Sequence, residues 1–149
     1  MTAVTITTQL STFTIIRDIL RGNSSIGAKF AKTDFYEFEE KLKAIKTRIP
    51  LFVIMIPSTE TDLLVFDSSS TIKEFSVGIL LKMDYSARDN FITYANAVIY
   101  EIEKSSTTFE ASGYYFPKIE LIKADAEVED EKQLIVGEFE LKLTGNVVR

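Results

Sequence analysis

One alternating stretch, residues 72–85, constrains the fold of this chain more than any other feature. Apolar side chains occupy one set of alternate positions, namely Phe75, Val77, Ile79, Leu81, Met83 and Tyr85, while Glu74, Ser76, Lys82 and Asp84 fall on the other set. Successive side chains of a strand point to opposite faces, so this pattern predicts a long strand with one face buried. A sheet with one buried face needs a second layer of structure to cover it.

Three stretches have the spacing of amphipathic helices, which could supply that layer: about 8–21, 34–49 and 86–103. Their apolar residues recur every three or four positions, as expected for one buried stripe per helix. The stripes are Leu10, Phe13, Ile16 and Leu20; Phe35, Phe38, Leu42, Ile45 and Ile49; and Phe91, Ala95, Val98 and Ile102.

Residues that favour helix ends flank these stretches. Gly22 is placed to end the first helix. Asp34 and Glu37 have the spacing of a capping box before the second helix, which Pro50 should close. Ser86 is the expected cap of the third helix. The segments 22–31 and 105–108 are small and polar, and we expect both to be surface loops.

Four further segments are expected to be strands: 51–56, 63–66, 114–128 and 134–143. The first, LFVIMI, is apolar throughout and so is expected to be covered on both faces. The last has Ile135, Gly137, Phe139, Leu141 and Leu143 on one face. An acidic turn separates the last two strands, which predicts an antiparallel hairpin.

These segments predict an α+β fold in one domain spanning residues 1–149. Their order is α-α-β-β-β-α-β-β, and the short connections favour a mostly antiparallel sheet of about five strands. The amphipathic helices should pack mainly on one face of that sheet.

Composition narrows the classes of function. The chain has no His and no Cys, which removes the commonest general base, metal ligand and thiol nucleophile. Its formal charge of -5 and pI near 4.9 argue against specific nucleic-acid binding, which depends on clustered Lys and Arg. The longest apolar run, 51–56, is too short to span a bilayer, and the first residues lack a signal-peptide pattern. We expect a soluble protein that is not exported and has no membrane partner.

Two motifs suggest ligands but fit poorly. The segment GNSSIGAK, residues 22–29, is close to a phosphate-binding loop. However, Ala28 displaces its lysine, Phe30 replaces the hydroxyl residue, and the segment follows a helix rather than a strand, so we expect a plain loop. The segment DAEVEDE, residues 125–131, is rich in oxygen ligands, but Asp130 and Val136 stand where a calcium loop needs Gly and Glu.

We therefore interpret the acidic segment as a solvated hairpin tip. It contains Asp125, Glu127, Glu129, Asp130 and Glu131. If this tip lined the channel of an assembly, its carboxylates would repel passing DNA rather than bind it.

Paired carboxylates and serines give no persuasive catalytic site. Asp84 and Asp89 are near a helix start, where Asp89 has a capping role, and Glu101 and Glu103 diverge on a helix. The serines at 68–70 have no histidine to activate them. We expect no catalytic, metal or cofactor site.

An aromatic cluster gives the strongest indication of an interface. Tyr114, Tyr115 and Phe116 are consecutive and precede Pro117. Consecutive residues of a strand cannot all face one core, and aromatic residues are enriched at protein interfaces. Core packing is the alternative interpretation of the cluster, but at least one ring should be exposed or covered by a partner.

The order of segments resembles the tail terminator and tail-completion proteins of tailed bacteriophages. The resemblance rests on the first helix (QLSTFTIIRDIL), the apolar strand PLFVIMIP, the strand–helix unit FSVGILLKMDYSARDNFITYANAVIYEIE and the final VGEFELKLTG. It covers most of the chain and consists of patterns of polarity rather than of catalytic residues.

The resemblance implies a structural virion protein that forms a ring, often sixfold, at the head-to-tail junction. Such a ring caps the tail tube and connects it to the neck, so its partners are copies of itself, the tube and the neck proteins, with DNA passing through the channel without specific binding. The protein would reside in the virion, and in the host cytoplasm during assembly. Two alternatives stay open: another connector or tube-like ring protein, or a soluble domain that binds a small molecule or peptide between its helices and sheet.

Overall fold

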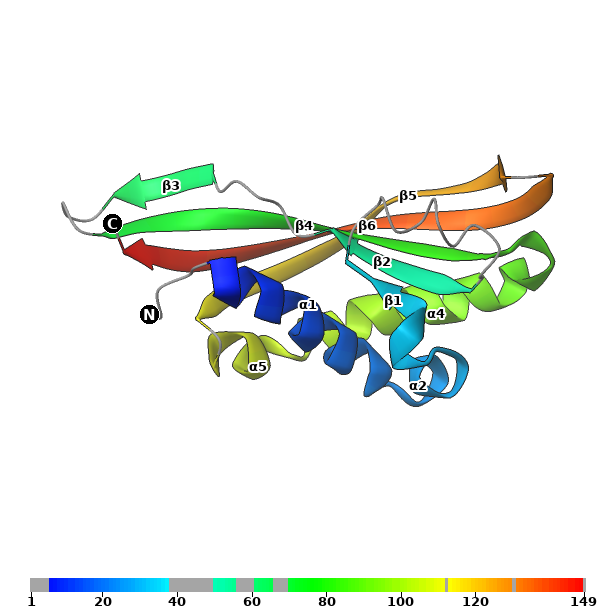
Figure 1. The fold of residues 1–149 in the computed structure, drawn as a ribbon, viewed down its shortest axis with the longest axis horizontal. Coiled ribbons are helices and arrows are strands. Elements are labelled where there is room, and N and C mark those ends of the chain that lie inside the picture. Colours follow the sequence, from blue (N-terminus) through cyan, green and yellow to red (C-terminus); the bar gives the residue numbers. More distant parts are fainter. Residues whose placement is uncertain are drawn as a thin grey trace.

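The molecule is an elongated sheet with helices packed against one face (Figure 1). The computed structural model describes residues 6–37, 50–55, 61–65, 70–111, 113–129 and 131–148. Its helices are α1 (Ile6–Arg21), α2 (Ser24–Lys29), α4 (Arg88–Glu103) and α5 (Ser106–Ala111), with short 3-10 turns η1 (Lys32–Asp34) and η2 (Tyr85–Ala87). Its strands are β1 (Phe35–Tyr36), β2 (Leu51–Met55), β3 (Thr61–Val65), β4 (Ser70–Asp84), β5 (Tyr114–Glu129) and β6 (Lys132–Val148).

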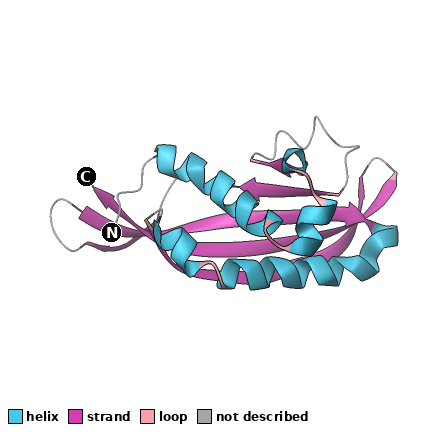
Figure 2. Ribbon diagram, turned by 90° about the horizontal axis from the view of Figure 1, so that it is seen from below, coloured by secondary structure: helices cyan, strands magenta, loops and turns pink. Residues whose placement is uncertain are grey.

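The sheet has the order β1-β2-β4-β6-β5, and β3 pairs with β4 beside this path. All the pairings are antiparallel except that of β1 with β2. The expected α+β class and the final hairpin are confirmed, and Figure 2 shows the helices lying over one face of the sheet. The 72–85 prediction corresponds to β4, which pairs with β6 without a register shift from Ser70↔Val148 to Asp84↔Leu134.

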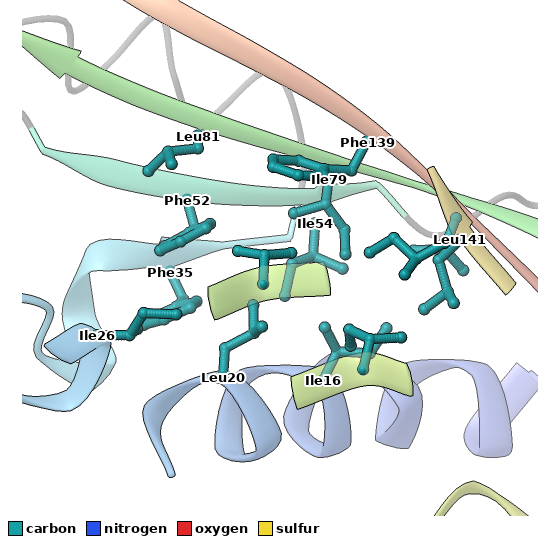
Figure 3. Packing of buried hydrophobic residues seen from close by; sticks show 14 of the residues in the cluster. Ile16, Leu20, Ile26, Phe35, Phe52, Ile54, Ile79, Leu81, Phe139 and Leu141 are labelled. Atoms are coloured by element: carbon teal, nitrogen blue, oxygen red, sulfur yellow. The ribbon is translucent and has the colours of Figure 1, made fainter. Parts of the chain in front are cut away.

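The main core lies between the helices and the sheet. Val77, Ile79, Leu81 and Met83 of β4 are buried in it, as the alternation predicted, whereas the side chain of Phe75 lies outside the described part. Figure 3 shows Ile16 and Leu20 of α1 pointing toward the sheet, together with residues of β2, β4 and β6. The predicted stripe of α4 is likewise buried, consisting of Phe91, Ala95, Val98 and Ile102.

Strand β2 is covered on both faces, as its apolar sequence predicted. Phe52 and Ile54 belong to the main core, while Leu51 and Val53 join a smaller cluster on the far face. That cluster also contains Leu80, Leu134 and Val136. The uninterrupted apolar run of β2 therefore reflects burial on two sides rather than a helical segment.

The segment 22–31, expected as a loop, contains the short helix α2. The Oδ1 of Asn23 accepts hydrogen bonds from the backbone N–H groups of Ser25 and Ile26, at 3.0 and 3.2 Å. Ile26 and Phe30 are buried in the main core. The loop prediction was wrong because it weighed the small residues and missed an Asn cap followed by apolar residues four positions apart.

The start of the expected second helix is also different. Asp34 ends η1, and its carboxylate accepts a hydrogen bond from the backbone N–H of Ala31 at 2.8 Å. Phe35 and Tyr36 then form β1 beside β2, and Phe35 stacks on Phe52 with ring centroids 5.0 Å apart. Packing of the Phe35 ring outweighs the local helical pattern at this position. The rest of the predicted helix, residues 38–49, lies outside the described part.

Two predictions around α4 need correction. Ser86 does not cap the helix, because it lies within η2, the 3-10 turn that precedes α4. Asp84 accepts hydrogen bonds from the Ser86 backbone N–H and hydroxyl, at 2.9 and 2.7 Å. Residues 106–108 of the expected loop instead form the start of α5, which buries Phe109. A single apolar side chain anchors this short helix to the core.

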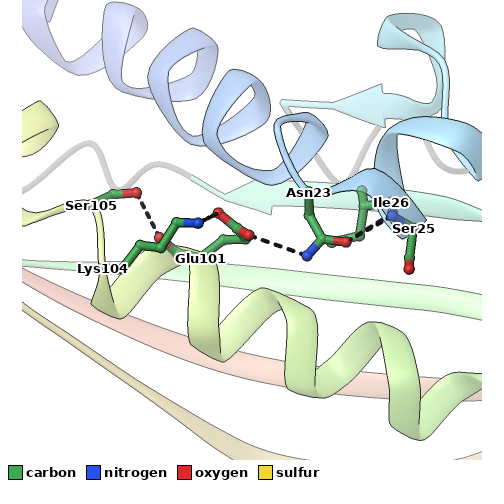
Figure 4. A network of polar contacts seen from close by, with 6 residues as sticks. All are labelled: Asn23, Ser25, Ile26, Glu101, Lys104 and Ser105. Carbon is green, nitrogen blue, oxygen red and sulfur yellow. Dashed lines mark hydrogen bonds and ion pairs between the residues drawn. The ribbon is translucent and has the colours of Figure 1, made fainter.

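A buried carboxylate links α4 to the α1–α2 turn (Figure 4). Glu101 is only 6% exposed. It accepts a hydrogen bond from Asn23 at 3.2 Å and lies 3.3 Å from the Nζ of Lys104. Because Asn23 also caps α2, this contact holds three helices in one arrangement.

Candidate interface on the edge strand

Strand β5 forms one edge of the sheet and runs beside α4. It pairs only with β6 among the described residues, so its outer N–H and C=O groups face away from the sheet. Two register shifts interrupt it, one between Tyr115 and Lys118 and one between Leu121 and Lys123. Pro117 and the first shift blunt the start of this edge, whereas the stretch from Lys118 onward has no proline.

The aromatic cluster at the start of β5 is divided between core and surface. Tyr114 is buried, and its hydroxyl accepts a hydrogen bond from the Thr12 hydroxyl of α1 at 2.7 Å. Tyr115 is half-buried, and Phe116 is 78% exposed. The backbone of Phe116 has a φ of 55°, so the irregular backbone at this bulge turns its ring outward. The expectation that at least one ring is exposed or partner-covered is consistent with this arrangement.

The exposed large apolar side chains gather on two neighbouring elements. In the part of the chain that the structure describes, they are Ile92 and Tyr100 of α4, and Phe116, Leu121, Ile122 and Val128 of β5. Exposed apolar residues are ordinary when scattered, but their concentration on two neighbouring elements indicates a contact surface. We call this set the α4/β5 apolar band.

An open groove of about 440 Å³ runs through the band between α4 and β5. Phe91, Ile92 and Ala95 line its helix side, and Leu121 and Ala124 line its strand side. Ile122, which follows Leu121 at the second register shift, instead lines a shallow hollow on the far face with Met55 and Glu138. The shift therefore places apolar side chains on both faces of the same edge strand.

The charges along β5 are arranged unusually with respect to β6. Lys118 is directly opposite Lys142, and Glu120 is directly opposite Glu140. Like charges in these positions repel each other. Each strand offsets this by ion pairs along its own length, Lys118 with Glu120 at 3.8 Å and Lys142 with Glu140 at 3.6 Å. On the face of the sheet away from the helices, β5 therefore carries side chains of alternating charge.

The described side chains of the acidic tip, those of Asp125, Glu127 and Glu131, are exposed. Glu129 ends β5, Glu131 occupies the turn with a φ of 67°, and Asp130 lies outside the described part. Asp125 lies 3.2 Å from the Nζ of Lys123. This hydrogen bond and the charges of Asp125 and Glu138 raise the pKa of Lys123. Within the described ranges, no group of acidic residues has the geometry of a metal site.

Sequence reasoning identified the aromatic cluster but not the rest of the α4/β5 apolar band. Ile92 is adjacent to the predicted stripe of α4, and Leu121 and Ile122 stand within the predicted strand. The adjacent pair Leu121–Ile122 between charged neighbours was the available signal, because a regular strand cannot bury two consecutive side chains on one face.

Comparison of the sequence with protein-family models and with curated proteins gave no match. None of the helices that the structure describes combines the length and the apolar character that a membrane span requires.

Proposed function

We propose that this protein is a structural subunit that acts by assembly, forming a ring at a phage-type head-to-tail junction that caps the tail tube and connects it to the neck. The α4/β5 apolar band carries this proposal, because its side chains are the large apolar groups that the described fold leaves in water. A contact with another subunit would remove that surface from water, which favours association. The resemblance to tail terminators supplies the identity of the ring, and another connector or tube-like ring protein is the nearest alternative.

The chemistry of the surface is suited to a protein contact. An interface typically has an apolar centre and a polar rim. Here Ile92 and Leu121 border the groove, and Arg88, Asp89 and Asn96 border it as well. The acidic tip on the same strand would face the channel in the proposed ring, where it would keep DNA from adhering.

Assembly can be tested with one variant in the band and one beside it. Ile92→Glu places a charge in the groove, whereas Thr93→Glu places it on the next, exposed position of α4. We expect wild type and Thr93→Glu to form annular oligomers, seen by native mass spectrometry and negative-stain imaging. Ile92→Glu should form no annular oligomers and should keep an unchanged circular dichroism spectrum.

A different class of function would use the same groove for a small ligand. The groove is comparable in volume with ligand sites, although it is open along one side. A wild-type protein that stays monomeric at all concentrations, and whose melting temperature a metabolite raises, would contradict the ring and support ligand binding.

A further inference from the structure

We propose that, before it assembles, this protein is a two-fold dimer in which the β5 strands of two copies pair antiparallel along their open edges. This goes beyond the ring, since a ring joins different surfaces of neighbouring copies and a two-fold dimer joins the same surface to itself. A free strand edge is a site for uncontrolled pairing, and mutual pairing would cover it.

The row of charges on β5 is complementary to itself when it is reversed. On the far face of the sheet the strand presents Lys118, Glu120, Lys123 and Asp125, which read positive, negative, positive, negative. In an antiparallel pair that centres Leu121 and Ile122 on the two-fold axis, Lys118 lies opposite Asp125 of the second copy. Glu120 then lies opposite Lys123 of that copy. Both directly opposite charge pairs in this register join opposite signs.

The same register uses the charges that repel each other within the chain. Lys118 and Glu120 face like charges on β6. Opposite charges on a neighbouring strand can therefore reach them only from the open edge of β5, where the second copy would lie. The axis places apolar groups at the centre of the contact. Leu121 lies on the helix side and Ile122 on the far side, so each face of the paired strands would gain a symmetric apolar contact.

Charge reversal tests the register. Glu120→Lys or Lys123→Glu alone puts like charges opposite each other twice in each dimer, and we expect either change to raise the dimer dissociation constant about tenfold. The double variant Glu120→Lys/Lys123→Glu restores both pairs and should return the constant to near its wild-type value. Glu103→Lys, on an exposed position of α4, is the control and should leave it unchanged. Sedimentation velocity at a series of concentrations gives these constants.

Cross-linking gives a second readout, because the chain has no native cysteine. Under oxidation, Glu120→Cys/Lys123→Cys should form a covalent dimer, whereas Glu120→Cys/Glu103→Cys should not. A monomeric wild type, single reversals without effect, or a double variant that is not restored would overturn the two-fold pairing. If annular particles still form in those cases, the proposed ring stands and only this dimer is wrong.

Discussion

Glu101 shows how one polar residue can fix the packing of several helices. It occupies a position next to the apolar stripe of α4, and its carboxylate contacts Asn23 and Lys104. Removing a buried hydrogen-bond acceptor leaves its donor without a partner, which costs about 1–3 kcal/mol. The stability of the helical layer therefore depends on a residue whose type normally signals an exposed position.

We expect Glu101→Ala to lower the free energy of unfolding by about 1–3 kcal/mol, because the amide of Asn23 loses its acceptor. Glu101→Gln keeps an acceptor oxygen and should lose less. Glu103→Ala, an exposed neighbour, should change stability by less than about 0.5 kcal/mol. Urea denaturation measures all three, and equal losses for the Ala and Gln variants would contradict the role of the hydrogen bond.

Asp84 gives the turn into α4 a dependence on pH. The hydrogen bonds from the Ser86 hydroxyl and backbone N–H lower the pKa of the Asp84 carboxyl below the value of about 3.9 in a free Asp. A folded-state pKa below the unfolded one stabilises the fold above the unfolded pKa, and this contribution disappears as the pH falls through the folded pKa. The stability difference between wild type and Asp84→Ala should therefore be full at pH 7 and shrink in acid.

The same assignment can be checked without unfolding the protein. An NMR titration of the Asp84 carboxyl should show its pKa moving back toward the ordinary value in Ser86→Ala, which removes the hydroxyl donor. No movement in that variant would show that the hydroxyl is not the cause.

Among the elements, α4 and β6 make an unusually close contact. A Cβ added to Gly137 would lie 2.5 Å from the Cζ of Phe91, a buried ring of α4. Glycine at this position therefore lets the helix approach the strand, although glycine weakens a strand in other respects. The distance between the two layers is set here by the absence of a side chain.

Gly137→Ala should lower the free energy of unfolding by about 1–3 kcal/mol, because the Phe91 ring is enclosed and must move. Gly78→Ala on β4 is the matched control. Its added Cβ would meet the Cε of Met55 at 2.7 Å, which is the flexible end of a half-buried side chain. Guanidinium denaturation should show a clearly smaller loss for Gly78→Ala, and the reverse order would contradict the packing argument.

At the scale of the whole molecule, the helices lie on one face of the sheet and leave the β5 edge open. β6 is paired on both sides, with β4 and with β5, whereas β5 has α4 beside it and no further strand in the described ranges. Both proposals concern this side: the ring would cover the α4/β5 apolar band, and the dimer would cover the strand edge. The variants at Ile92 and at Glu120 separate the two contacts.

Much of the candidate site could not be predicted from the sequence. The aromatic cluster was visible, because three consecutive rings cannot share one face of a strand. The outward direction of Phe116 depends on the bulge, and the position of Ile92 beside Leu121 depends on the docking of α4 against β5. These features join residues far apart in the chain, so no local pattern contains them.

The sequence by itself determined the elements whose side chains alternate or recur over many residues. β4, the buried stripe of α4 and the final hairpin belong to this class, because backbone geometry alone fixes which face each side chain takes. The tertiary structure decided the positions at which packing outweighs the local sequence pattern. Phe35 lies in a strand there, Ile26 and Phe109 lie in short helices, and Glu101 lies in the core. The tertiary structure also decided which apolar residues stay in water, because exposure depends on how whole elements pack and not on the order of residues within one of them.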